Sequence, residues 1–91
     1  PVEFNGRTTR LSVYPNPTRD LLNVTYELPG EGTVIWSVVD QSGRRVMSGT
    51  LGGAKGGNRF TIDAQGLEAG AYQVDVRMNG MDIGRARFVK Q

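Results

Sequence analysis

Hydrophobic and polar residues alternate along most of this chain with a period of two, which is typical of β-strands that bury one face. The clearest alternation runs over residues 72–78, and a similar one runs over residues 22–28. Residues 33–40 form the most apolar stretch and have apolar side chains on both faces, so they predict a central strand. No segment shows the period of about 3.6 residues that an amphipathic helix requires.

Turn residues separate these segments at intervals typical of a β-sandwich. The glycine-rich residues 52–57 predict a flexible loop, and residues 65–70 predict a corner where the chain crosses between sheets. The clearest tight turns are expected at residues 29–32, 41–44 and 79–80. The remaining strands are expected at residues 11–14, 45–51, 58–63 and 81–90. We therefore expect an all-β, immunoglobulin-like seven-stranded antiparallel β-sandwich over residues 10–91, with residues 1–9 as a linker.

Composition narrows the range of chemistry. The 91-residue chain is long enough for one domain, and it contains no cysteine and no histidine. It therefore lacks disulfides, thiolates, the commonest general base and the commonest zinc ligand. A net charge of +2 is too small to indicate nucleic acid, and no apolar run is long enough to cross a membrane. Because the chain begins at Pro1, we expect it to be part of a longer protein with any export signal upstream.

The acidic and nucleophilic residues do not form a recognisable catalytic or metal-binding pattern. The aspartates are scattered over different turns and strands, none at calcium-loop spacing, and are interpreted as turn caps or solvated residues. Without histidine, a serine nucleophile needs a lysine base. Neither Lys55 nor Lys90 has a serine at a recognisable spacing. We expect no catalytic residue, no metal and no cofactor.

Two motifs have a clear structural interpretation. Tyr14-Pro15-Asn16-Pro17 predicts a rigid turn, in which Asn16 and Asp20 are placed to make local backbone hydrogen bonds. In the corner before residue 72, Leu67 is expected to close the open end of the sandwich. Tyr72 begins the next strand, and its hydroxyl is expected to bond the backbone upstream, as in a tyrosine corner.

The carboxyl-terminal strand is basic. We expect Arg85, Arg87 and Lys90 to be the basic residues of one face, with Ala86 and Phe88 on the other. Such a strand can be a solvated edge whose charge prevents aggregation. It can also be a docking surface, and the residues alone leave both interpretations open.

In this order and spacing, these motifs resemble the C-terminal sorting domain of the type IX secretion system of Bacteroidetes-type Gram-negative bacteria. The resemblance covers residues 10–91. The residues that carry it are Tyr14, Pro15, Asn16, Pro17, Leu22, Asn23, Val24, Asp40, Gly43, Val46, Leu67, Gly70, Tyr72, Val74, Phe88, Val89 and Lys90. Members of this family often have lysines around the last strand, where this chain has Arg85 and Arg87.

The resemblance implies a non-enzymatic sorting signal attached to an upstream cargo domain. Cargo would enter the periplasm by an upstream signal peptide, and the outer-membrane translocon would recognise the folded domain and deliver the cargo to the cell surface or the medium. A sortase-like peptidase usually removes such domains. The residues implied to contact the translocon are Arg85, Arg87, Phe88, Val89, Lys90 and Gln91.

Two other functions fit the same fold. One is an extracellular adhesive or carbohydrate-binding module in which Trp36 or Tyr26 stacks on a sugar, although Trp36 in an apolar strand is expected to lie in the core. The other is a structural spacer. The glycine loop and exposed sheet edges would also permit a strand-exchanged dimer.

Overall fold

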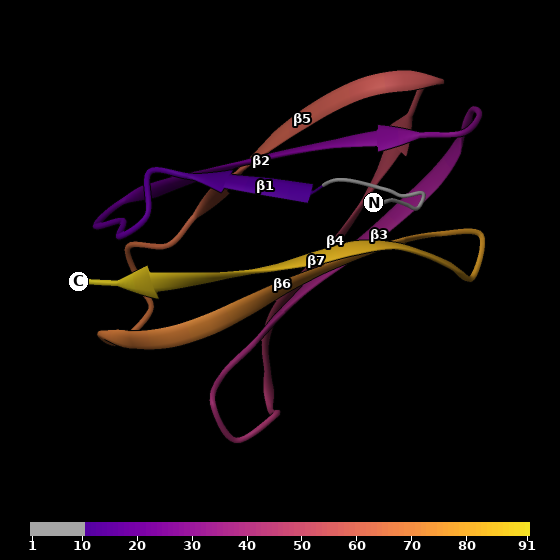
Figure 1. The fold of residues 1–91 in the computed structure, drawn as a ribbon. Helices are drawn as coiled ribbons and strands as arrows, with labels where there is room; N and C mark the ends of the chain where they lie inside the picture. Colours follow the sequence, from indigo (N-terminus) through magenta and orange to yellow (C-terminus); the bar gives the residue numbers. More distant parts are fainter. Residues whose placement is uncertain (1–10) are drawn as a thin grey trace, which may run out of the picture.

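The computed structural model describes residues 11–91, so the expected linker over residues 1–9 lies outside the described part. Seven strands form two antiparallel sheets that face each other (Figure 1). The strands are β1 (Leu11–Tyr14), β2 (Leu21–Leu28), β3 (Gly32–Val39), β4 (Arg45–Gly53), β5 (Gly56–Asp63), β6 (Gly70–Met78) and β7 (Met81–Lys90). This confirms the predicted immunoglobulin-like β-sandwich.

The two sheets place the first and last strands on the same side of the molecule. One sheet has the order β1-β2-β5 and the other has the order β4-β3-β6-β7, so β3 is internal, as predicted. β1 and β7 are each the edge strand of their sheet. Figure 1 shows β1 and β7 pointing the same way. The beginning and the end of the described chain therefore run alongside each other.

The core lies between the sheets and follows the predicted alternation. Apolar side chains from β2 and β6 supply most of it, and β3, β5 and β7 complete it with Val34, Val38, Ile62, Ile83 and Phe88. Trp36 packs against this core, with its ring centre 5.4 Å from that of Phe60. Trp36 is therefore partly buried at the margin of the core, where the sequence predicts a position within it.

The prediction of a flexible loop over residues 52–57 is wrong. Gly52 and Gly53 end β4, Gly56 and Gly57 begin β5, and only residues 54–55 lie between the strands. A Cβ atom on Gly53 would overlap the side chain of Leu28, so this glycine allows a close approach between strands. The Asn58 side chain also holds the turn, since it accepts from the Ala54 N–H (3.2 Å) and donates to the Ala54 carbonyl (2.7 Å).

The tight turns occur where the sequence predicts them. In the turn between β3 and β4, Gly43 has a φ of 87°, a conformation that favours glycine. Between β6 and β7, Asn79 and Gly80 have φ values of 52° and 81°, as a two-residue hairpin of type I′ requires. These turns fix the register of the strands that they join.

Candidate functional site

The last strand divides its side chains between solvent and core. Arg85, Arg87 and Val89 are exposed, whereas Phe88 is 1% exposed and Lys90 is 8% exposed. The expectation that Lys90 shares a face with the two arginines is wrong. Side chains alternate along a strand, and Lys90 lies three positions after Arg87, so the two side chains point to opposite faces.

Lys90 joins the last strand to the corner between β5 and β6. Its Nζ donates a hydrogen bond to the main-chain carbonyl of Leu67 at 2.9 Å. A lysine ammonium that leaves water needs such an acceptor. The Leu67 side chain packs against the core, which agrees with its expected place at the end of the sandwich.

Tyr72 forms the predicted tyrosine corner. Its hydroxyl donates to the main-chain carbonyl of Glu68 at 2.6 Å, and Gly70 begins the strand that Tyr72 enters. The Tyr72 ring stacks on the ring of Phe88, with centres 5.5 Å apart and planes at 19°. Tyr72 and Phe88 are also register partners in the pairing of β6 with β7. The corner therefore supports the last strand directly.

The proline turn also contacts the last strand, which the sequence does not indicate. The Asn16 Nδ2 donates to the Arg87 carbonyl at 3.1 Å, and the Val89 N–H donates to the Asn16 Oδ1 at 2.9 Å. The expectation of local backbone hydrogen bonds is wrong for the Asn16 side chain. Asp20 does not contact the last strand through this bond pattern. Its main-chain carbonyl accepts a hydrogen bond from the Ala64 N–H at 2.7 Å, just after β5. Tyr14 is half-exposed beside this turn, and the bonds before Pro15 and Pro17 are cis.

Thr18 extends these contacts to the end of the chain. Its N–H donates to the Val89 carbonyl at 2.8 Å, and its carbonyl accepts from the Gln91 N–H at 2.9 Å. Thr18 and Lys90 form a parallel bridge, and Thr18 is 1% exposed. We call residues 16–18 the clasp, because they bind residues 87–91 across the fold. Sequence reasoning missed Thr18, since main-chain pairing of this kind leaves no signal in side-chain chemistry.

Asp40 caps the turn between β3 and β4. Its Oδ1 accepts from the Ser42 hydroxyl (2.7 Å), the Ser42 N–H (2.9 Å) and the Arg44 N–H (3.0 Å). The Ser42 hydroxyl, followed by the Arg44 N–H, holds the pKa of this carboxyl below its ordinary value. Asp40 and Gly43 therefore shape the turn, which agrees with the interpretation of the aspartates as turn caps.

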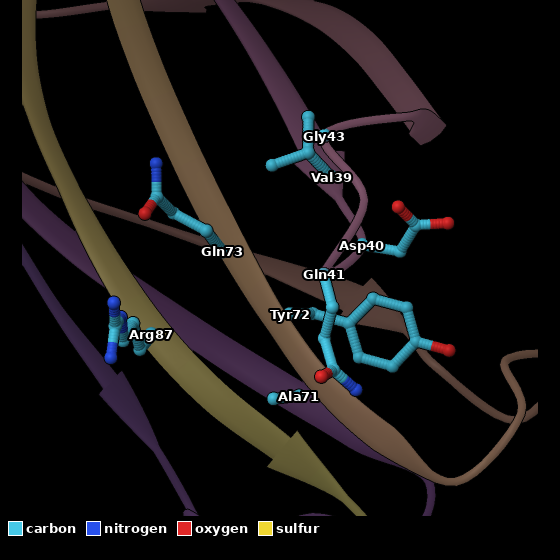
Figure 2. Close-up of a pocket in the computed structure, with 8 residues that line it drawn as sticks. All are labelled: Val39, Asp40, Gln41, Gly43, Ala71, Tyr72, Gln73 and Arg87. Atoms are coloured by element: carbon cyan, nitrogen blue, oxygen red, sulfur yellow. The ribbon is translucent and has the colours of Figure 1, made fainter.

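An open groove lies between this turn and the end of the last strand. Figure 2 shows Gln73 and Arg87 on one side of the groove and Asp40 on the other, with Gln41 and Tyr72 between them. Gln41 and Arg87 are exposed, and Gln73 is half-exposed. The groove offers amide and guanidinium groups for binding.

The described residues do not contain a cluster of three or more potential metal ligands among His, Cys, Asp and Glu. Within residues 11–91 there is also no helix with the length and apolar character needed to cross a membrane.

Comparison with curated proteins finds no match to the chain. A family profile described as "Secretion system C-terminal sorting domain" matches residues 12–90. The match includes the clasp, the tyrosine corner and all of β7, which are the parts that the structure brings together. The chain therefore belongs to the family of C-terminal sorting domains that act as signals for type IX secretion.

Proposed function

We propose that this domain directs an upstream cargo through the type IX outer-membrane translocon, and that the translocon recognises residues 85–91. The family consists of sorting signals and is not an enzymatic kind. The single observation that supports the proposed contact is the division of the last strand. It keeps Arg85, Arg87 and Val89 in solvent while the residues between them lie toward the sandwich interior.

The residues of this segment have different parts in the proposal. Phe88 and Lys90 are buried, so they act by holding the strand in place. Arg85, Arg87, Val89 and Gln91 are exposed and supply the contact surface. The Arg85 guanidinium lies 3.4 Å from the Asp82 carboxylate, a solvent-exposed pair that is worth little and can be exchanged for a partner's carboxylate.

Membership of the family supports the remaining steps of the proposal. We propose that the cargo passes through the periplasm and that a sortase-like peptidase removes the domain after export. Arg85 and Arg87 replace the lysines that the family often has. They keep the positive charge but present a planar guanidinium, which can bind a carboxylate through two hydrogen bonds.

The experiment is charge reversal at the proposed contact. We expect the R85E/R87E variant, fused behind a reporter protein in a bacterium with type IX secretion, to lose most export. A matched control is R45E/R59E, which changes the net charge equally on exposed residues of β4 and β5. Both variants are expected to fold. Normal export of R85E/R87E, or equal loss in both variants, would refute the proposed contact.

The carbohydrate-binding alternative gains no support from the two aromatic residues that it requires. Tyr26 is 3% exposed, and its ring packs edge-on against Phe60 with centres 5.7 Å apart. The Trp36 ring is partly buried and packs against Phe60, with ring centres 5.4 Å apart and planes at 31°. Sugar stacking needs an aromatic face open to solvent, which the buried Tyr26 ring does not offer.

A further inference from the structure

Residues of β1 and the clasp lie against the free edge of β7 from Gly84 onward. β7 is the last strand of its sheet, so one edge has no partner strand in that sheet. Near its beginning, a Cβ atom on Gly84 would come within 3.1 Å of the Leu11 Cβ, which places the start of β1 against β7. Near its end, the clasp bonds to residues 87–91. Residues 11–18 therefore follow β7 in parallel from Gly84 to Gln91.

The clasp reproduces the hydrogen bonds of a parallel strand. In a parallel pair, one residue donates to a carbonyl before its partner and accepts from an N–H after it. Thr18 does this around Lys90 with its main chain. The side-chain amide of Asn16 makes the same two bonds around Phe88, from Nδ2 to the Arg87 carbonyl and from the Val89 N–H to Oδ1. The Asn16 carboxamide thus replaces the hydrogen bonds of a backbone amide between Pro15 and Pro17, which have no backbone N–H to donate.

This arrangement limits how a partner can bind. An extended peptide that adds to a sheet edge needs free N–H and C=O groups on the edge strand. Both main-chain groups of Val89 and the carbonyl of Arg87 are already bonded to the clasp. The side chains of Arg87 and Val89 remain exposed.

We infer that the clasp and the last strand form one two-part signal. In this signal Asn16 is a positioning residue, and the partner reads the Arg87 and Val89 side chains instead of adding a strand to β7. This inference rests on the proposed function, since it concerns how the same segment is recognised. The partner surface that fits is a folded one carrying carboxylates opposite the arginines, because the exposed face is basic and the main-chain groups of Val89 and the Arg87 carbonyl are already bonded to the clasp.

The test compares N16A with N58A. Both residues make hydrogen bonds from an asparagine side chain to the main chain, but Asn58 holds the turn between β4 and β5. In N16A we expect the Val89 amide proton to exchange about fivefold faster or more, since the acceptor of the Val89 N–H is lost. N58A should leave this proton unchanged. Export of a reporter fused to the chain should fall in N16A and persist in N58A, even if the two variants melt at the same temperature.

A second variant, N16D, separates the effects of the two hydrogen bonds that the Asn16 side chain makes. N16D keeps the acceptor for the Val89 N–H but loses the donor to the Arg87 carbonyl, so we expect an intermediate loss of export. Unchanged Val89 exchange in N16A, normal export in N16A, or equal export loss in N58A would overturn the inference. If R85E/R87E is also exported normally, the proposed contact fails. If R85E/R87E is not exported while N16A is, only the present inference fails.

Discussion

Three polar side chains stabilise the carboxyl-terminal end of this domain and the corner beside it. Asn16 bonds to the edge of β7, Lys90 to the corner before β6, and Tyr72 to the main chain of that corner. Each uses a main-chain group as its partner, so each depends on the local backbone path and not on the identity of a neighbouring side chain. The end of the chain is therefore fixed by individual hydrogen bonds to residues that are far from it in the sequence.

Substitutions of Tyr72 should separate its ring from its hydroxyl. We expect Y72A to lower the free energy of unfolding by about 3 kcal/mol, because the stacking on Phe88 and the packing against the core are lost. Y72F should cost about 1 kcal/mol, since only the bond to the Glu68 carbonyl is removed. Urea unfolding of the three proteins measures both values. Little change in Y72A would contradict this account.

Asp40 should make stability depend on pH in the acid range. Hydrogen bonds from Ser42 and Arg44 depress its pKa in the folded state, so the unfolded state binds a proton first as the pH falls below the ordinary value of 3.8. The contribution of Asp40 is fully present well above that pH and is lost as the pH falls through the depressed folded pKa. Unfolding measured across the acid range should show a weaker pH dependence in D40N. Equal slopes in D40N and the unchanged chain would contradict the prediction.

Local hydrogen bonds could be predicted from sequence at this scale, and distant ones could not. The caps of Asp40 and the tyrosine corner need only a few neighbouring residues at the right spacing. The contact of Asn16 with residue 89 depends on which edge strands meet. The order of strands in both sheets decides which edge strands meet, and this order cannot be predicted from a single sequence.

At the scale of elements, β7 holds itself to the fold with alternate side chains and exposes the side chains between them to solvent. Its inward side chains reach the core and the corner, while its outward side chains form the basic face. The period of two predicted this strand and its neighbours correctly. The error at Lys90 arose because its charge suggested a solvated position, whereas the carbonyl of Leu67 makes a buried position possible.

Because side chains alternate between core and solvent along β7, substitutions of neighbouring residues should differ in their effects on stability and on export. F88A should lower the free energy of unfolding by about 3–5 kcal/mol, since Phe88 is 1% exposed and packs in the core. V89A should cost less than about 1 kcal/mol, because Val89 is 43% exposed. We expect V89A nevertheless to reduce export, since its side chain lies on the proposed contact face. Thermal unfolding gives the first comparison, and a large destabilisation in V89A would contradict the account.

The segment between β4 and β5 shows where composition misleads. Four glycines within residues 52–57 indicate flexibility, but they extend two paired strands. The close approach of Leu28 to Gly53 explains one of them, and this contact cannot be seen without the fold. The glycine loop therefore no longer supports the prediction of a strand-exchanged dimer. The exposed edges of β4 and β5 are the feature that still supports it.

At the scale of the whole molecule, the sandwich brings the beginning and the end of the described chain together. Residues 16–18 and 87–91 are adjacent in space because β1 and β7 lie on the same side of the two sheets. The matched family region contains residues 16–18 and all but the last residue of the second segment. Removing residues 87–91 would therefore remove the buried Phe88 and Lys90 as well as the exposed side chains, so surface substitutions are the sharper probes of recognition.

The central claim is that this chain acts as a type IX sorting signal. The most direct measurement is the location of a reporter protein that carries an inner-membrane signal peptide at one end and the 91-residue chain at the other. We expect the reporter at the cell surface or in the medium of cells with a working type IX translocon, and in the periplasm of cells without one. A reporter that stays in the periplasm of both strains, or leaves both equally, would contradict the claim.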